Sequence, residues 1–349
     1  MALELPMRRS DRLFRLLTEE LKSRAVVPFW QRLRELRHGY LSQSVLLYKL
    51  NAENRHLFVS DYQASVKTPD INGVYRVLVK DKLLFDLMTQ LFPALHIPTH
   101  GVVDRGKLLY GNCGASQDLV GYISDLLKDR ERLVFKPVVG GGGAGIVFVE
   151  RRGNAYALNQ EVVSAAELAA WLGALENNLL TDFVTQAPEL AHFFPHTTNT
   201  IRLLTMWDAD GPFVASAVLR IGTRASIPVD NGLKGGIAAG IDLATGQVSK
   251  AVSFPRHTGQ AIWYANHPDT GAQIEGVVIP RWQKLLSEME EVCRRIPYLR
   301  YIGWDIVVTE NGSKLIEGNH FPGLWPNQAH QPLLADPRVL RFYKSYGVV

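Results

Sequence analysis

Residues 133–145 read Leu-Val-Phe-Lys-Pro-Val-Val-Gly-Gly-Gly-Gly-Ala-Gly, and a second apolar run follows at 146–149. A lysine inside an apolar strand must direct its charge toward a partner, because an unpaired buried ammonium is costly. Glycines between two strands let backbone N–H groups surround a polyphosphate without obstruction by side chains. A flexible hairpin tip with a snorkelling Lys136 is the alternative. The stretch is neither a Walker A loop, since Gly-Lys-Ser/Thr is missing, nor a dinucleotide fingerprint, since a strand follows the glycines.

A predicted hairpin near the end of the chain carries three oxygen-bearing side chains. Its strands are expected at 301–309 and 314–320, joined through an Asn-Gly turn. Glu317 and Asn319 share a strand face because they are two residues apart, and Asp305 is expected across from Glu317. Such a set would suit Mg²⁺ that bridges nucleotide phosphates. An exposed hairpin with its polar residues outward is the alternative.

Polar residues also interrupt apolar runs in the second half of the chain. Arg202 and Arg220 lie among aliphatic residues, and a buried arginine usually meets a carboxylate or a phosphate. Structural ion pairs are the alternative for either arginine. Asn199 precedes the first run, and Asp230-Asn231 stands ahead of a Gly-Gly pair. The Asp-Asn pair could reach a substrate or simply form a turn.

Apolar periodicity indicates an α+β protein. Leucines at spacings of three and four predict helices from about residue 8 to 60. Further helices are expected from Asp81 to Leu91, from a capping box at Ser164, and between Pro280 and Pro297. The second half otherwise reads as strands. The remaining strand predictions are 182–186, 200–206 and 213–220, the last two joined as a hairpin.

Composition excludes several classes of protein. The 349 residues are 46% hydrophobic and 21% charged, which excludes a disordered tail, a fibrous repeat and a disulfide-rich miniprotein. Cys113 and Cys293 cannot form a disulfide framework and lack metal-site spacing, which favours a reducing compartment. No apolar run is long enough for a membrane span, and Met1–Ser10 lacks the order of a signal peptide. We therefore expect a cytoplasmic protein.

The charge balance gives no sign of a nucleic-acid partner. Thirty-eight Lys and Arg against 34 Asp and Glu leave a net charge of +4, and the basic residues are scattered. The densest basic cluster, Arg32 to His38, lies in a predicted helix and is read as a solvated helix face. A mildly basic surface is compatible with an anionic small substrate.

Together these features resemble the ATP-grasp superfamily, and within it the sugar-transfer-associated ATP-grasp group, related to α-L-glutamate ligases. The Asp…Glu-x-Asn…Pro-Gly pattern after a lysine and a glycine loop is specific, whereas the glycine loop alone is not. The resemblance covers about residues 70–330. The matching stretches are Phe-Lys-Pro with its loop (135–145), Asn-Thr-Ile-Arg (199–202), Val-Asp-Asn with Gly-Gly (229–236), Gly-Trp-Asp (303–305) and Glu-Gly-Asn-His-Phe-Pro-Gly (317–323).

The resemblance implies a fold in which two α+β lobes clasp ATP. A helical segment at 1–72 would precede an N-terminal lobe at 73–185 and a C-terminal lobe at 186–349. Lys136 would contact the α- and β-phosphates, and Lys82 looks like the second phosphate lysine, although it could be a surface charge. Gln186 occupies the hinge position at which many relatives carry an acidic residue. The nucleotide-site assignment is completed by Gly141, Gly142, Gly143, Gly145 and Asn199.

The resemblance also implies the chemistry. Asp305, Glu317 and Asn319 match the Mg²⁺ ligands. The other implied roles are charge neutralisation by Arg202 and Arg220 and contact with the second substrate by Asp230 and Asn231. A carboxylate would attack the γ-phosphate of ATP, and an amine would displace phosphate from the acyl phosphate. A phosphotransferase and a nucleotide-binding module without turnover are the alternatives.

Two regions remain open. Residues 1–72 could replace a substrate domain or form a helical arm of a homodimer. Trp263-Tyr264, His267 and Trp325 could line an acceptor pocket or serve ordinary packing.

Overall fold

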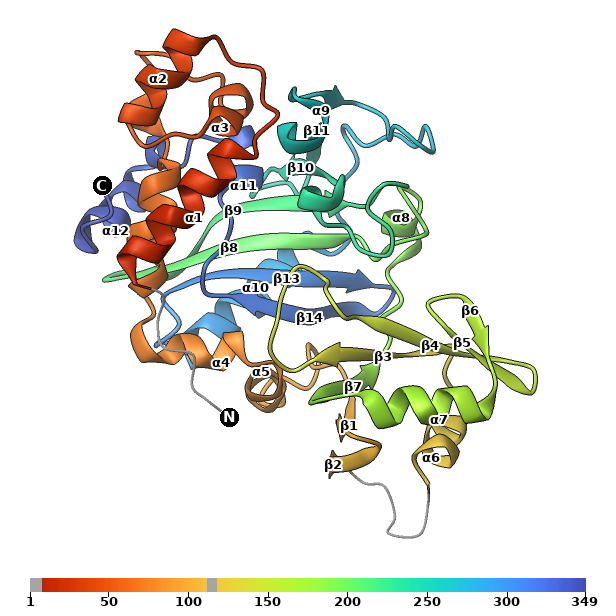
Figure 1. Ribbon diagram of the computed structural model, residues 1–349. Coiled ribbons are helices and arrows are strands. Elements are labelled where there is room, and N and C mark those ends of the chain that lie inside the picture. Colours follow the sequence, from red (N-terminus) through yellow and green to blue (C-terminus); the bar gives the residue numbers. More distant parts are fainter. Residues whose placement is uncertain (1–7, 112–117) are drawn as a thin grey trace. The chain divides into compact units, whose positions relative to one another are not determined.

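The computed structural model describes residues 8–111 and 118–349, and Figure 1 shows its ribbon diagram. Two expectations from the sequence concern residues outside this range. They are the one on Cys113 and the part of the N-terminal one that falls on residues 1–7. The chain divides into two compact units. The larger comprises the chain up to Arg76, Gln186–Gly312 and Gly318–Val349, and the smaller comprises Val77–Thr185 and Ser313–Glu317. The predicted roles of the segments 1–72, 73–185 and 186–349 remain predictions.

The smaller unit is built on a seven-stranded antiparallel sheet of order β2-β1-β7-β3-β4-β5-β6. Its strands are β1 (Thr99–Asp104), β2 (Lys107–Gly111), β3 (Arg132–Pro137), β4 (Val147–Arg152), β5 (Ala155–Leu158), β6 (Glu161–Val163) and β7 (Asn178–Asp182). Its helices are α4 (Val77–Lys80), α5 (Lys82–Thr89), α6 (Leu119–Leu126) and α7 (Ala165–Ala174).

Alternation along β3 separates its apolar side chains from its lysine. Leu133 and Phe135 are fully buried in the cluster that also contains Ile123 of α6 and Leu168 of α7. Because successive side chains of a strand point to opposite faces, Lys136 projects from the other face of the sheet. The packing of α6 and α7 therefore fixes the direction in which the lysine points.

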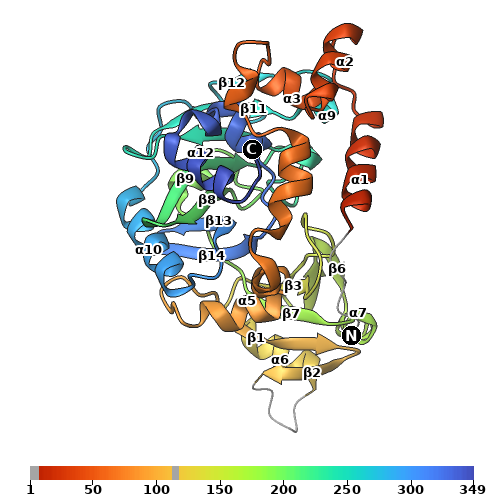
Figure 2. The same ribbon diagram turned by 90° about the vertical axis from the view of Figure 1, so that its left-hand side faces the viewer.

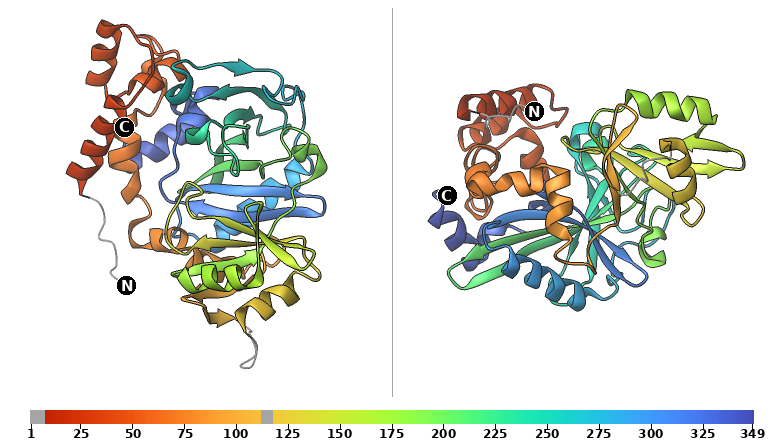
Figure 3. Two further views of the ribbon diagram at one scale, coloured as in Figure 1. Left: turned by 45° about the vertical axis from the view of Figure 1, so that its right-hand side comes forward. Right: turned by 90° about the horizontal axis from the view of Figure 1, so that it is seen from below.

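The larger unit contains a second seven-stranded sheet, of order β12-β11-β10-β9-β8-β13-β14. Figure 3 shows its central strands side by side in green and blue. The strands are β8 (Thr200–Asp208), β9 (Gly211–Ile221), β10 (Ile237–Ile241), β11 (Val248–Ser253), β12 (Trp263–Tyr264), β13 (Tyr301–Thr309) and β14 (Gly312–Asn319). The α-helices of this unit are α1 (Arg9–Leu21), α2 (Phe29–Arg37), α3 (Ser42–Leu47), α8 (Pro188–Ala191), α9 (Pro255–Thr258), α10 (Trp282–Arg295), α11 (Trp325–His330) and α12 (Pro337–Ser345).

The two faces of this sheet differ in what covers them. Helix α10 lies beside β13 (Figure 2). Trp304 of β13 donates Nε1–H to Thr205 Oγ1 (2.8 Å), and both residues contact Cys293 of α10. Burial raises the pKa of the Cys293 thiol to about 11. Asp305 follows Trp304 and therefore points to the opposite face, where α11 reaches the sheet through Asn327 and Ser216.

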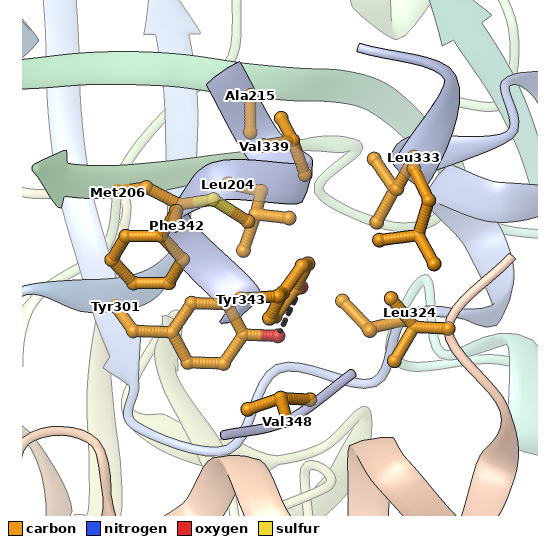
Figure 4. Packing of buried hydrophobic residues seen from close by; sticks show 12 residues of the cluster. Leu204, Met206, Ala215, Tyr301, Leu324, Leu333, Val339, Phe342, Tyr343 and Val348 are labelled. Atoms are coloured by element: carbon orange, nitrogen blue, oxygen red, sulfur yellow. Dashed lines mark hydrogen bonds between the residues drawn. The ribbon is translucent and has the colours of Figure 1, made fainter. Parts of the chain in front are cut away.

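A large apolar cluster supports one end of the sheet in the larger unit. Figure 4 shows Leu204 and Met206 of β8 packed with Tyr301 of β13 and with Phe342 and Tyr343 of α12. The two tyrosine hydroxyls lie 3.0 Å apart, so each buried hydroxyl has a hydrogen-bonding partner. This cluster fixes β13 upstream of Asp305.

Local sequence signals predicted most of the elements that carry candidate site residues. The 200–220 hairpin, the helix before Pro297 and the Ser164–Glu167 capping box are confirmed. The strand predicted over 182–186 is wrong, because β7 ends at Asp182. The Asp182 carboxylate binds the side chains of Arg130 and His100 at 2.6 Å each, so a tertiary contact anchors the chain as it leaves the sheet.

Candidate functional site

Two lysines of the smaller unit lie close enough to influence each other. Burial and the nearby charge of Lys82 lower the pKa of Lys136 to about 8, against an opposing effect of Glu317 and Asp86. Burial likewise lowers the pKa of Lys82, again opposed by Glu317. Lys82 Nζ donates to the carbonyl of Gly140 (2.7 Å), and Asp81 caps the helix on which Lys82 stands. Among the residues that the structure describes, none forms a hydrogen bond or ion pair with Lys136.

The glycine loop adopts a backbone that requires glycine at three of the four predicted positions. Gly142, Gly143 and Gly145 have φ of +68°, +72° and +72°, in the left-handed region. A Cβ at Gly145 would also lie 2.8 Å from Pro137 Cγ. Gly141 has no such restriction, and a Cβ there would meet no atom within 4 Å. The part of the loop that leads into β4 therefore requires glycine to adopt its backbone conformation.

Four charged side chains of the larger unit form a continuous buried cluster. Arg202 donates Nε–H to Asp305 Oδ1 (2.5 Å) and Nη2–H to Oδ2 (3.1 Å). Arg220 joins two carboxylates, with Nη1–H to Asp305 Oδ2 (3.0 Å) and Nη2–H to Asp230 Oδ1 (2.7 Å). Asp230 Oδ2 accepts the backbone N–H and the hydroxyl of Thr200. Two guanidinium groups and two carboxyl groups are thus hydrogen-bonded to one another inside the protein.

The two aspartates respond differently to this environment. Burial alone would raise the pKa of Asp305, but the charges of Arg202 and Arg220 outweigh it and hold the pKa below the usual range. Burial raises the pKa of Asp230 and outweighs the charge of Arg220, and the like charge of Asp305 adds a smaller effect in the same direction. Asp305 is therefore the carboxylate that the cluster keeps ionised.

The donor set predicted for Mg²⁺ consists of hard oxygen ligands. Asn319 donates Nδ2–H to Gly303 O (3.3 Å) and to Asp305 Oδ2 (3.4 Å), which turns its amide oxygen away from these acceptors. Asp305 and Asn319 belong to the larger unit, and Glu317 belongs to the smaller. Within residues 8–111 and 118–349, no three His, Cys, Asp or Glu side chains gather in a metal-binding group. Two carboxylates and one amide oxygen nevertheless fit Mg²⁺ in donor chemistry.

Asn199 and Gln186 use their side chains inside the protein. The Asn199 amide donates to the carbonyls of Leu190 and Phe194, and its oxygen accepts from Gly222 N–H and the Thr197 hydroxyl. All four hydrogen-bonding positions of this amide are then occupied. Gln186 Oε1 accepts the backbone N–H of Asn199 (2.9 Å). These contacts favour a positioning role for both side chains.

Asn231 and the aromatic candidates also have structural partners. Asn231 Oδ1 accepts Leu233 N–H (2.9 Å), as in a turn. His267 is buried, with its Nε2 2.8 Å from the carbonyl of Gly222. Trp325 packs on Phe254 with ring centroids 3.9 Å apart, and Trp263 meets His330 edge-on at 5.2 Å.

A pocket between β9, β10, β11 and α11 was missed by the sequence analysis. Its volume is about 470 Å³, and its lining includes two exposed acidic residues, Asp242 and Glu275. Asn327 donates to Ser216 Oγ (2.7 Å) and is 1% exposed, yet its Oδ1 has no hydrogen-bonding partner. His330 borders the pocket with its pKa lowered by burial to about 4, so its ring is neutral at pH 7. A buried amide oxygen without a partner was the missing signal, and only a folded structure reveals it.

Comparison with known proteins gives one family. A family model described as sugar-transfer associated ATP-grasp matches residues 68–338. No curated protein matches the sequence.

Several solved structures are similar at low identity. They include an ADP complex of N5-carboxyaminoimidazole ribonucleotide synthetase (10% identity, TM-score 0.40) and D-alanine-D-alanine ligase from Helicobacter pylori (12%, 0.41). The alignments cover 70% and 76% of this chain, but only 45% and 58% of those chains. D-alanyl-alanine synthetase A from Vibrio cholerae aligns at 11% identity and TM-score 0.43, over 80% of this chain and 67% of its own.

Proposed function

Because the chain belongs to the sugar-transfer associated ATP-grasp family, we propose that it is an ATP-dependent carboxylate–amine ligase. A substrate carboxylate attacks the γ-phosphorus of ATP, and the bond to the bridging oxygen breaks to release ADP. The amine nitrogen then attacks the acyl carbon of the acyl phosphate, and phosphate leaves as the nitrogen loses a proton. The products are an amide, ADP and phosphate.

The observation that carries the proposal is Lys136. Its ammonium is largely buried, lies near the like charge of Lys82, and forms no hydrogen bond or ion pair with any described residue. Such a group is costly unless an anion binds it, and a nucleotide phosphate is the anion that this family supplies. We assign Lys82 and Lys136 to the phosphates and the glycine loop to their backbone contacts.

We propose that the remaining predicted residues bind Mg²⁺ or stabilise the negative charge of the phosphates. We assign Asp305, Glu317 and Asn319 to Mg²⁺, which when bound would neutralise phosphate charge. Arg202 and Arg220 hold the Asp305 carboxylate ionised and in a fixed orientation. We also assign to these arginines the stabilisation of the transferring phosphoryl group.

The pocket beside α11 is our candidate for the amine substrate. Its lining includes the carboxylates of Asp242 and Glu275 and the neutral ring of His330, so it favours a ligand rich in hydrogen-bond donors. Ser216 and Arg220 lie on the same face of β9, about 13 Å apart along the strand. We infer that the pocket holds a part of the amine substrate remote from its nucleophile.

The function predicts a strict requirement for two substrates. With Mg-ATP and a panel of carboxylates, each with and without amines, we expect ADP and phosphate release that needs one acid and is accelerated by one amine. Chromatography of the products should show the amide. A stable phosphorylated product without an amine would instead identify a phosphotransferase. Tight ATP binding without any release across a broad panel would contradict a ligase.

The pocket predicts a selective effect on one substrate. In the double variant Ser216→Ala/Asn327→Leu, both partners of one buried hydrogen bond are replaced, so stability should change little. We expect the KM for the amine identified in the panel to rise about 5- to 20-fold, because one or two hydrogen bonds are lost. The KM for ATP should stay unchanged. Equal KM values for the amine in variant and wild type would remove the pocket from the substrate site.

A further inference from the structure

Helix α1 turns its apolar side away from the protein. Its buried residues recur at intervals of four and are Arg12, Leu16 and Glu20. Leu13, Phe14, Leu17 and Leu21 lie on the other side of the helix and are exposed, Phe14 by 73% and Leu21 by 83%. A helix on a globular protein ordinarily buries its apolar side, so this arrangement is inverted.

Ionic contacts of two buried residues of the helix fix α1 in this orientation. Arg12 donates two hydrogen bonds to the Asp70 carboxylate (2.9 and 2.8 Å) and a third to the carbonyl of Val66 (3.0 Å). Glu20 accepts from Arg32 Nε (2.6 Å) and from the backbone N–H and hydroxyl of Ser42. Rotating the helix to bury its leucines would break all of these contacts. The outward apolar face is therefore built into the fold.

Helix α2, which lies next to α1 (Figures 1 and 2), also exposes apolar side chains. Phe29 and Trp30 are 68% and 77% exposed, with their rings in edge contact at 5.2 Å. Of the 23 exposed large apolar side chains in the described parts of the chain, eight fall within the 21 residues from 13 to 33. We call these eight the α1–α2 apolar surface: Leu13, Phe14, Leu17, Leu21, Val26, Phe29, Trp30 and Leu33.

This surface is surrounded by positive charge. Residues 8–38 contain nine Arg and Lys against four Asp and Glu, a net charge of +5, whereas the whole chain carries +4. Two of the four acidic residues, Glu20 and Glu35, are buried in ion pairs with arginines. Exposed basic residues include Arg15, Lys22, Arg24 and Arg37. The solvent-facing side of the two helices is thus apolar and cationic together.

These observations favour one kind of partner. A second copy would bring the same positive charge against this one, which opposes self-association. In an anionic bilayer, leucine and aromatic side chains enter the boundary of the headgroups and acyl chains while arginine and lysine meet lipid phosphates. No helix among the described residues is long and apolar enough to cross a membrane. We propose that the α1–α2 apolar surface docks this protein on the surface of an anionic lipid bilayer.

The test is sedimentation of the full chain with lipid vesicles. We expect binding to phosphatidylcholine vesicles that contain about 30% phosphatidylglycerol, and much weaker binding to phosphatidylcholine alone. Phe14→Ser/Trp30→Ser should weaken binding to the anionic vesicles at least about ten-fold, because these two side chains supply much of the apolar area. Arg24→Gln/Arg37→Gln should weaken it less, and salt at about 0.5 M should remove that difference.

Matched controls separate this proposal from general stickiness. Leu109→Ser/Val162→Ser removes two exposed apolar side chains of the smaller unit, 61% and 65% exposed, and should bind vesicles as the wild type does. Failure of the wild type to bind anionic vesicles would overturn the proposal. Wild-type binding by Phe14→Ser/Trp30→Ser would do the same. A wild-type dimer in light scattering that this variant converts to monomer, without vesicle binding, would identify a second copy as the occupant.

Discussion

Replacing Asp305 with asparagine is expected to abolish turnover and to lower the free energy of unfolding by about 3 kcal/mol. The change preserves the shape of the side chain but leaves the largely buried guanidinium groups of Arg202 and Arg220 without the carboxylate that joins them. Removing one partner of a buried ion pair typically costs about 3–5 kcal/mol. Urea unfolding measures the stability, and ADP release measures the activity. Arg202→Met added to this variant should restore part of the stability and none of the activity.

Asp208→Asn is the matched control for this experiment. Asp208 stands on β8 and accepts two hydrogen bonds from Arg338 (2.9 and 2.8 Å), outside the charged cluster. The same chemical change there should reduce stability and leave turnover intact. Full activity in Asp305→Asn would show that this carboxylate takes no part in the reaction. Because the pKa of Asp305 is held below the usual range, its stabilising contribution should persist at neutral pH and disappear only in acid.

Replacing Lys136 with methionine should have opposite effects on nucleotide binding and on stability. ATP affinity should fall about 100-fold, because one or two charge-assisted hydrogen bonds to phosphate are lost. At pH 7 the nucleotide-free protein should become about 2 kcal/mol more stable, since the variant no longer holds a largely buried ammonium. Titration calorimetry measures the first effect and urea unfolding the second. Lys107→Met, on the outer strand β2, should change neither.

The lowered pKa of Lys136 also predicts how the difference in stability between wild type and variant changes with pH. The unfolded chain keeps the Lys136 proton up to about pH 10.5, whereas the folded chain releases it near pH 8. The wild type should therefore gain stability relative to Lys136→Met as the pH rises from about 8 to 10. Bound phosphates would raise the pKa again, so ATP binding at about pH 8.5 should take up protons in the wild type and not in the variant. Unchanged ATP affinity in Lys136→Met would remove the lysine from the phosphate site.

Sequence signals that act locally predicted most of the elements on which the candidate residues stand. The alternation around Lys136, the hairpin at 200–220 and the helix capped by Asp81 all depend on neighbours within a few residues. The Arg202–Asp305 pair joins residues 103 apart, and nothing in the sequence distinguishes this partner from a phosphate. The role of Asn199 is also not evident from the sequence, because its amide is occupied by four contacts that form only in the folded chain, one of them with Gly222, 23 residues away.

Helix α1 shows a second limit of prediction from sequence, which concerns the side of a helix that is covered. The spacing of Leu13, Leu16, Leu17 and Leu21 predicts a helix, and α1 is that helix, but periodicity does not say whether the apolar side is covered. The answer lay in two polar residues of the same segment, Arg12 and Glu20. Each is itself buried, forms polar contacts with residues outside the helix, and thereby fixes the rotation of the helix.

The ionic contacts that hold α1 to the rest of the larger unit also determine how this attachment responds to solution conditions. An interface that rests on Arg12–Asp70 and Glu20–Arg32, with Leu16 as its one buried leucine, loosens as ionic strength rises. It changes little on cooling, because cooling weakens mainly apolar contacts. The outward side of the helix depends on both variables, because its basic residues would meet lipid phosphates and its leucine and aromatic side chains would enter the acyl boundary. Cooling should therefore weaken the contact with lipid more than it weakens the attachment of the helix to the protein.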